Sequence, residues 1–592
     1  GLSPEYIFAG LGGSPDQRGF GVFWVDRQAL ATAYNMAGAF NQLAGAITYA
    51  SGNITGATGV LSGTSFTVNA TTAVSLDAIL GAGTTLTMNG AGGTLTLTKA
   101  NTFTGGTTVT AGTLALGFAN ALPGAVTVNG GTLSLASFNN TAGAVTFTSG
   151  SITGTTGVLS ATSITSATSG TLSLDALMGG SGTLTMSGTG TLAVTRANAS
   201  FSGATSVSAG TLQAGDNAAF GTAVITISGT GTLDLNGKTL TNAVTLTNGT
   251  LAGGTISASQ LTLTNGTISA ILGSGALTKS TAGSVTLTGA NTFTGGTTLS
   301  AGQININAAT ALGNGTFTIS GGTIAGSTGV LSTTAISATP AGTATISAII
   351  GGSTAITLNG AGALVLSGDN TFSGGTTITT GTLRVGHDRA LGSAGLTLNG
   401  GGLSNAGSSA ITIANDLSLT ADIGLGSATF AGALDLTGAV DFTGTTRTLT
   451  VASGVSLSGV VSNGGLTKAG TGALTLNAAN TYAGDTTVSA GSLLQGRANA
   501  LGAVTNLLTV GSAGTVDLKG FALTVSGLAN IKKFPEHLNA GHRRFLSGAK
   551  PYDLDVFPDL DLTSLYPAGP YRTAPGYAEY ILHRHHERFV DL

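Results

Sequence analysis

Apolar and polar residues alternate along most of this chain with a period of two. Five related stretches show the alternation most clearly, and their apolar pairs are Leu95 and Leu97, Leu192 and Val194, Val285 and Leu287, Leu364 and Leu366, and Leu474 and Leu476. Successive side chains of a strand point to opposite faces, so each stretch predicts a strand with one buried face and one face in water. The pattern therefore predicts an all-β protein.

One longer phrase recurs around these strands. ANTFTGGTTVTAGTL at 100–114 returns in five versions, each headed by an Asn that an aromatic residue follows: Asn101 and Phe103, Asn198 and Phe201, Asn291 and Phe293, Asn370 and Phe372, and Asn480 and Tyr482. The Asn residues are 97, 93, 79 and 110 positions apart. One coil of a solenoid takes roughly 20 to 30 residues, so each repeat predicts a module of several coils.

Two further phrases keep a nearly constant order between the copies. Ala-Leu-Gly turns occur at 311–313, 390–392 and 500–502, with looser versions at 121–123 and 219–221, and relatives of SLDAILG begin at Ser75, Ser173, Thr267 and Thr345. Gly and Asn at the recurring turns supply backbone angles that other residues adopt at a cost. We therefore expect an elongated parallel β-helix, or β-solenoid, of about five multi-coil modules.

Composition divides the chain into three parts. Residues 1–50 contain the only Trp and a stretch, DRQALATAYNMAGAFNQLAGAI, whose apolar spacing fits a helix, so we expect a partly helical cap or assembly segment. Residues 51–530 form the repetitive body, in which 22 of 480 residues are charged. Residues 531–592 form a charged tail rich in Pro, Tyr and His, which we expect to dock onto a partner or to be partly disordered. Both ends are candidate caps for the open edges of a stacked sheet.

Charge and cysteine content exclude several classes of function. The chain has a net charge of −3 and no Cys, so thiolate metal sites, Cys nucleophiles and a basic footprint for nucleic acid are excluded. No uninterrupted apolar run reaches about 18 residues, so no transmembrane helix is expected. The chain starts at Gly1 without a basic and apolar leader, which predicts that any signal peptide has been removed.

The repeated residues have a structural and a functional interpretation. The five Asn residues suit corners that bond their own backbone, and the alternative is a site that holds a glycan. The five aromatic residues suit core packing, and the alternative is stacking on sugars. Asp77 and Asp175 share one module position, which is Ser or is absent in the other modules, and this argues against a catalytic role. Twelve scattered Asp and the single histidine His387 in the body do not form the paired carboxylates of a glycosidase, so no catalytic residue and no cofactor is expected.

The tail offers weak candidates for metal binding. Asp553, Asp555, Asp559 and Asp561 alternate in a pattern that suits Ca²⁺, but the Gly and the final Glu of an EF-hand loop are missing. His583, His585 and His586 have ligand chemistry for a transition metal. A solvated acidic stretch and exposed terminal histidines are the favoured interpretations, so we expect no metal site.

The string LTKAGTGALTLNAANTYAGDTTVSAGSLLQG at 466–496, with its four shorter relatives, resembles the autotransporter-associated β-strand repeat. That repeat occurs in passenger domains of bacterial type V secretion proteins. The resemblance implies a right-handed parallel β-helix, export to the cell surface or the outer membrane, and no catalytic residues. Such proteins usually end in an outer-membrane translocator, but this chain ends in HRHHERFVDL, so we expect a translocator that is separate or has been removed.

Two functions of different classes follow. The first is an extracellular, adhesin-like rod that contacts glycans or proteins of a cell surface or matrix. The second is a structural subunit that joins copies of itself head to tail through its ends into a fibre. A polysaccharide-acting β-helix enzyme is a third hypothesis, because fold alone does not decide function.

Overall fold

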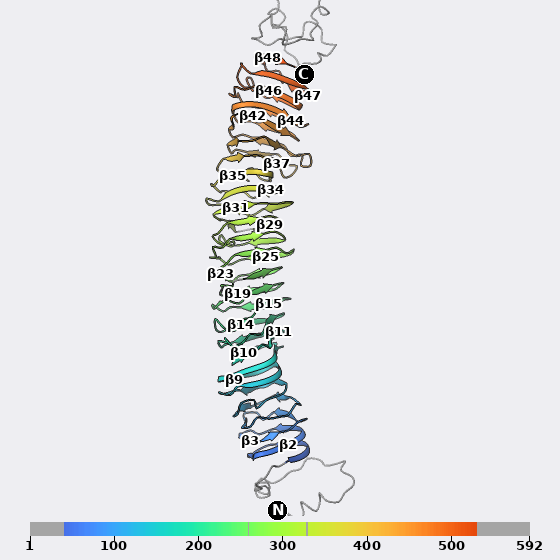
Figure 1. Cartoon of the computed structure of the whole chain (residues 1–592), viewed down its shortest axis with the longest axis vertical. Coiled ribbons are helices and arrows are strands. Elements are labelled where there is room, and N and C mark those ends of the chain that lie inside the picture. The colour runs from blue at the N-terminus through green and yellow to red at the C-terminus, as the bar shows by residue number, and fades with distance from the viewer. Residues whose placement is uncertain (1–40, 259, 327–328, 530–592) are drawn as a thin grey trace, which may run out of the picture. The chain divides into compact units, whose positions relative to one another are not determined.

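The computed structural model describes residues 41–258, 260–326 and 329–529. The chain divides into two compact units, Gly1–Gly275 and Ala276–Leu592, which are described separately. Within the described ranges the regular elements are strands, with no helix among them (Figure 1). Paired strands run parallel, as β2, β4, β6 and β8 do. Each unit is thus a parallel β-solenoid, which confirms the predicted fold class.

The first unit contains the strands β1 to β23. Their bounds are β1 (Asn41–Tyr49), β2 (Ile54–Val68), β3 (Ala73–Leu80), β4 (Thr85–Met88), β5 (Thr94–Leu97), β6 (Thr107–Val109), β7 (Thr113–Leu116), β8 (Val126–Ser134), β9 (Asn140–Ser166), β10 (Thr171–Gly179), β11 (Thr183–Met186), β12 (Thr191–Val194), β13 (Thr205–Val207), β14 (Thr211–Ala214), β15 (Ile225–Ile227), β16 (Thr232–Asp234), β17 (Thr239–Leu240), β18 (Val244–Leu246), β19 (Thr250–Ala252), β20 (Thr255–Ile256), β21 (Leu261–Leu263), β22 (Gly266–Ile268) and β23 (Ile271–Leu272).

The second unit contains the strands β24 to β48. Their bounds are β24 (Leu277–Lys279), β25 (Ser284–Leu287), β26 (Thr297–Leu299), β27 (Gln303–Ile306), β28 (Phe317–Ile319), β29 (Gly322–Ala325), β30 (Val330–Leu331), β31 (Ala335–Ala338), β32 (Thr343–Ile346), β33 (Ile349–Ile350), β34 (Ala355–Leu366), β35 (Thr376–Val385), β36 (Leu396–Leu398), β37 (Gly402–Asn405), β38 (Ile411–Ile413), β39 (Leu417–Leu419), β40 (Ile423–Leu425), β41 (Leu434–Leu436), β42 (Val440–Val451), β43 (Val455–Leu457), β44 (Val461–Ala469), β45 (Ala473–Leu476), β46 (Thr486–Gln495), β47 (Leu507–Asp517) and β48 (Gly527–Ala529).

The register shows how much chain one coil uses. Thr67 pairs with Thr87, Thr87 with Thr108, and Thr108 with Thr127, so these successive coils take 20, 21 and 19 residues. The separations of 79 to 110 residues between the Asn-headed phrases therefore correspond to several coils each, as the repeat spacing predicts.

The core of each unit is a stack of identical side-chain positions. Leu95, Leu114, Leu133 and Ile152 pair in consecutive coils, and each is at most 1% exposed. Burial of one such side chain stabilises the fold by roughly 1.5–3 kcal/mol. The intervening Thr and Ser point outward, where a β-branched side chain favours the extended backbone without adding charge.

The N-terminal boundary differs from the prediction. Residues 41–49 lie in the segment for which a partly helical cap was expected, but they form β1, which pairs in register with β2. Parallel pairing with the next coil overrides the weak helical pattern of this stretch. The rest of the expected cap, residues 1–40, lies outside the described residues, as does the tail from residue 530 onward.

Candidate functional site

The five repeated Asn residues lie inside the solenoid, where each is at most 6% exposed. Asn101 Oδ1 accepts a hydrogen bond from Leu80 N (2.8 Å), and its Nδ2 donates to Ala121 O (2.8 Å). The same pair of contacts to the preceding and following coils occurs at Asn198, Asn370 and Asn480. Asn291 Nδ2 donates in the same way to Ala311 O (2.6 Å). Each side chain thus satisfies buried backbone groups that would otherwise lack partners.

These contacts explain why three phrases recur together in the sequence. The acceptor carbonyls belong to the first Ala of the Ala-Leu-Gly turns and their looser versions, 20 or 21 residues further on. For Asn101, Asn198 and Asn370 the donor N–H belongs to a relative of SLDAILG in the coil before. The expected bond of the Asn to its own local backbone is therefore not the main contact, because the side chain spans neighbouring coils.

A second set of buried Asn residues escaped the sequence analysis. Asn140, Asn242 and Asn415 lie one coil beyond an Ala-Leu-Gly or related turn and donate to carbonyl groups in or next to that turn. Asn506 follows its turn at 500–502 directly, and it donates to Leu501 O of that turn and to Tyr482 O of the preceding coil. All four are at most 8% exposed. Asn242, Asn415 and Asn506 share a signal, a lone Asn one or two residues before an alternating strand, as in NAVTL, NDLSL and NLLTV.

The five aromatic residues of the phrase lie in the core. Phe103, Phe201, Phe293, Phe372 and Tyr482 are at most 2% exposed. A Cβ added at the glycine of the next Ala-Leu-Gly turn would lie 2.7 Å from the Phe293 ring at Gly313 and 3.0 Å from the Phe372 ring at Gly392. Since the rings fill the space under these turns, they are not accessible for stacking on a sugar.

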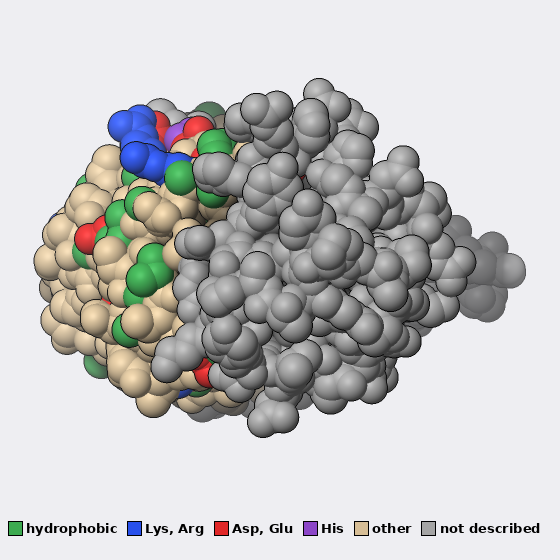
Figure 2. Space-filling model, turned by 90° about the horizontal axis from the view of Figure 1, so that it is seen from above, with side chains coloured by type: hydrophobic (Ala, Val, Ile, Leu, Met, Phe, Trp, Pro, Cys, Tyr) green, Lys and Arg blue, Asp and Glu red, His purple; other side chains and the backbone are tan. Residues whose placement is uncertain are grey.

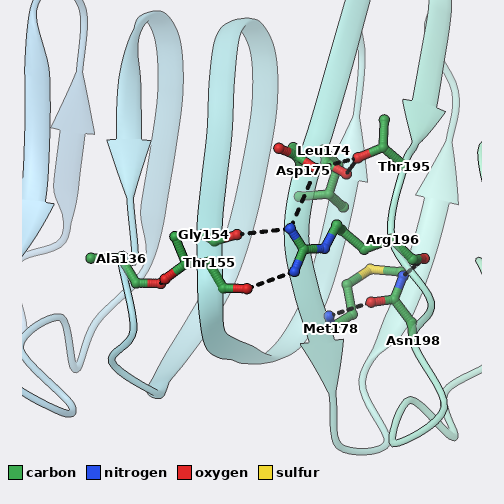
Figure 3. Close-up of polar contacts among 9 residues, drawn as sticks. All are labelled: Ala136, Gly154, Thr155, Leu174, Asp175, Met178, Thr195, Arg196 and Asn198. Atoms are coloured by element: carbon green, nitrogen blue, oxygen red, sulfur yellow. Dashed lines mark hydrogen bonds and ion pairs between the residues drawn. The ribbon is translucent and has the colours of Figure 1, made fainter.

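Asp77 and Asp175 each form an ion pair with a cation in the next coil. Arg196 lies between Asp175 (3.9 Å) and the carbonyl oxygens of Gly154 and Thr155, and Thr195 Oγ1 donates to Asp175 (2.6 Å), as Figure 3 shows. Asp77 has the matching partners Thr98 (2.8 Å) and Lys99 (3.2 Å).

The hydrogen bond from Thr98, with a further contribution from Lys99, lowers the pKa of Asp77. A carboxylate with a lowered pKa stays ionised and serves poorly as a general acid near neutral pH. Asp77 is therefore best explained as a partner that links adjacent coils, and the contacts of Asp175 with Thr195 and Arg196 link adjacent coils in the same way.

Two lysines replace apolar residues in the core of the second unit. Lys279 and Lys468 are 0% exposed and occupy the inward position that Met88 and Met186 fill in the first unit. Lys468 Nζ donates to the carbonyl oxygens of Ala469 (3.0 Å), Gly470 (2.8 Å) and Ala490 (2.9 Å). Burial lowers the pKa of Lys279 and lowers that of Lys468 to about 8. The two ammonium groups are thus held by backbone oxygens and oppose folding when protonated.

Replacement of Lys468 by Met should flatten the pH dependence of the second unit's stability. The unfolded chain holds the proton up to a pKa of about 10.4, so between pH 8 and that value it binds more protons than the folded unit. Stability therefore rises with pH across this window. We expect the urea concentration at the unfolding midpoint to be higher at pH 9.5 than at pH 7.5. This rise should be smaller in K468M and smallest in K468M/K279M.

Exposed Lys519 provides the control for this series, and in K519M the urea midpoint should rise with pH as steeply as in the original chain. Measurements stay below pH 10, because burial raises the pKa of Tyr482 and its retained proton reverses the trend at higher pH. A slope unchanged in the double variant would contradict the proposed origin.

Among the residues that the structure describes, the remaining charged groups do not form a catalytic arrangement. His387 Nδ1 and Arg389 Nη2 both face Asp369, at 3.9 and 2.5 Å, and Asp485 Oδ1 accepts a bond from Leu507 N (2.9 Å). Figure 2 shows one small group of Lys or Arg, Asp or Glu, and His side chains on a surface made mostly of uncharged groups. Among the described residues, no three His, Cys, Asp or Glu lie close enough to hold a metal ion.

The candidate metal ligands of the tail cannot be placed. Asp553, Asp555, Asp559 and Asp561, and His583, His585 and His586, lie outside the described residues. Within the described ranges, no helix has the length and hydropathy needed to cross a bilayer.

One outward column of the first unit is continuous over many coils. Its members pair from coil to coil and form what we call the threonine column: Thr67, Thr87, Thr108, Thr127, Thr146, Thr165, Thr185, Ser206, Thr226, Thr245 and Thr262. All eleven are at least partly exposed. The column is accessible along its length and offers hydroxyl and methyl groups but no charge.

Five segments of the chain match the passenger-associated-transport-repeat: residues 86–116, 179–214, 277–306, 356–385 and 466–494. Each segment contains one Asn and aromatic pair of the recurring phrase. The chain thus carries five of these passenger repeats, which confirms the resemblance to autotransporter passenger domains.

A stretch of 114 residues is 39% identical to the adhesin BmaC autotransporter of Brucella suis biovar 1 (strain 1330). The alignment covers 19% of this chain and 3% of that protein. The chain thus spans a small fraction of the length of this relative. No solved structure gives a significant match.

Proposed function

We propose that this chain is part of an autotransporter-like passenger whose solenoid is displayed outside a bacterial cell and holds adhesive faces against another surface. The observation that carries the proposal is the set of five passenger-associated-transport-repeats. The Asn of each repeat forms hydrogen bonds between coils, and the aromatic residue of each repeat packs in the core. The repeats thus build a scaffold, and the contact with a partner falls to the outward columns.

The chemistry of the described residues supports a binding role over an enzymatic one. The acids of the described solenoid are paired with neighbouring coils or bond backbone N–H groups, as Asp77, Asp175 and Asp485 do. Hydrolysis of a glycosidic bond normally needs two carboxyl groups within about 5 to 10 Å on either side of the bond. A screen of neutral and acidic polysaccharides without turnover would agree with this proposal, and sustained turnover would contradict it.

The fibre hypothesis depends on the two ends of the chain. The segments expected to join copies head to tail, residues 1–40 and 530–592, lie outside the described residues. Electron microscopy of the purified full chain separates the hypotheses, because single particles at micromolar concentration favour the adhesin and end-to-end filaments favour the fibre.

Display of the full chain should make a non-adherent laboratory bacterium stick to cells or matrix. The chain is fused to a foreign translocator, its surface exposure is checked with an antibody, and adherent bacteria are counted by microscopy. We expect a several-fold rise over bacteria that display the translocator alone. Equal adherence of the two strains, with the chain shown to be exposed, would contradict the proposed function.

A further inference from the structure

The hydroxyls of the threonine column are free to meet a ligand. Within the described residues, the one side-chain hydrogen bond among its eleven members joins Ser206 Oγ to Thr185 Oγ1 (3.2 Å). Each other hydroxyl retains one donor and two acceptor sites. The column is therefore a line of unused hydrogen-bonding groups on a rigid sheet.

The residues on either side of the column leave it accessible. One flanking column consists of the residues that precede each member by two positions: Ser65, Thr85, Gly106, Ala125, Ala144, Ser163, Thr183, Ala204, Val224, Ala243 and Gln260. The other flanking column consists of the residues that follow each member by two positions: Asn69, Asn89, Thr110, Asn129, Thr148, Ala167, Ser187, Ser208, Ser228, Thr247 and Thr264. Several of the latter are tied back to the preceding coil, as Thr110 and Ser208 are to the carbonyls of Met88 and Met186. The three columns together form what we call the hydroxyl face.

The hydroxyl face carries no charged and no aromatic side chain. Acidic polysaccharides, nucleic acids and anionic lipids need cations, so their recognition here is excluded. A single sugar usually needs an aromatic ring to stack on, so it would bind weakly. Many weak contacts along one chain add up through multivalency, and this favours a polymer as the partner.

The spacing of the column agrees with an extended polymer. Neighbouring strands lie about 4.7–4.9 Å apart, a distance comparable to the advance of one hexose in an extended polysaccharide. We propose that the hydroxyl face binds an uncharged, extended polysaccharide along the threonine column, with one sugar ring opposite each coil. This inference rests on the proposed adhesive function and names the partner of that function.

A shorter threonine column of the same unit provides a matched control. Its members Thr171, Thr191, Thr211, Thr232, Thr250 and Thr267 pair in the same way, but its flank contains Asp234, whose Oδ2 accepts a bond from Gln213 Nε2 (2.9 Å). This column is called the control column. It has six members against the eleven of the threonine column, so it should bind the same polymer more weakly through fewer contacts.

The test is affinity electrophoresis of the full chain in gels that contain mannan, xyloglucan or hydroxyethylcellulose, with alginate as the acidic comparison. We expect retardation by at least one neutral polymer, none by alginate, and no change with 0.5 M NaCl. A column variant, T87V/T108V/T127V/T226V/T245V, should bind at least tenfold more weakly. A control variant, T191V/T211V/T232V/T250V/T267V, should bind within twofold of the original chain. Val keeps the β-branched shape that strands favour, and circular dichroism checks that both variants fold.

Several results would overturn the inference. These are no retardation by any neutral polymer, retardation by alginate alone, or equal losses in the two variants. Sedimentation that shows a dimer lost only in the column variant would identify a second copy of the chain as the occupant instead. If bacteria that display the column variant adhere as well as bacteria that display the original chain, this inference is contradicted and the proposed function is not. Polysaccharide binding without adherence would support the inference and contradict the proposed function.

Discussion

Replacement of Asn370 by Leu should destabilise the second unit by about 2–6 kcal/mol. Asn370 is 2% exposed, accepts from Ile350 N (2.8 Å) and donates to Ala390 O (2.6 Å). Leu has a similar volume but leaves both backbone groups buried without a partner, at roughly 1–3 kcal/mol each. Urea unfolding of the full chain measures the loss, and hydrogen exchange at the Ile350 amide should accelerate.

The control for N370L is another Asn of the same unit that lies at the surface. Asn399 is exposed, and its Oδ1 accepts a bond from Thr420 Oγ1 (3.1 Å). N399L should change stability by about 0.5 kcal/mol or less, as surface substitutions usually do. Similar losses in N370L and N399L would show that the contacts to neighbouring coils are not what stabilises the repeat.

Replacement of Gly381 by Ala should be the most damaging single-methyl change at the corners of the second unit. Gly381 has φ +78°, and an added Cβ would lie 2.0 Å from Gly360 O and 2.5 Å from Gly362 O of the preceding coil. The backbone angle alone costs roughly 1–2 kcal/mol, and the overlap adds a forced shift of the stacked coil that costs typically 1–3 kcal/mol more. We expect a total loss of about 2–5 kcal/mol by urea unfolding.

Gly444 separates the two contributions. It has φ +82°, but a Cβ there would meet no heavy atom within 4 Å. G444A should therefore show only the cost of the backbone angle, about 1–2 kcal/mol. Equal losses in G381A and G444A would mean that the close stacking of coils at the Thr-Gly-Thr-Leu corner of residues 380–383 adds nothing to the requirement for glycine.

Much of the fold could be predicted from the sequence, because a strand's burial follows directly from its alternation. Leu95 and Leu97 are buried as expected, and so is each aromatic residue of the phrase. The same alternation places Lys279 and Lys468 on the inward face, after Leu277 and Leu466. That signal could have revealed the buried lysines, although lysine is a residue type that is almost never fully buried without a partner.

The partners of the buried Asn residues could not be predicted in the same way. A contact such as that of Asn101 with Ala121 depends on the length of one coil, and a period of two along a strand says nothing about that length. The local turn chemistry of Asn therefore suggested a bond within the corner. Asn140, Asn242 and Asn415 were missed for a related reason, since they lie one coil away from the turns to which they donate hydrogen bonds.

The threonine column likewise becomes visible only once the register is known. Thr and Ser are so frequent in the body that no single one attracts attention in the sequence. Pairing at intervals of 17 to 21 residues, as from Thr245 to Thr262 and from Ser206 back to Thr185, places them in one line. A regular surface column can thus be missed in a sequence in which Thr and Ser are frequent everywhere.

The central claim is that the solenoid is a displayed scaffold whose outward faces hold another surface. The most direct measurement is the retention of microspheres coated with the purified chain on a cell layer under flow, compared with albumin-coated microspheres and with microspheres that carry the heat-unfolded chain. We predict several-fold greater retention for the folded chain than for either control. Retention equal to that of albumin, with the coating confirmed by antibody, would contradict the account.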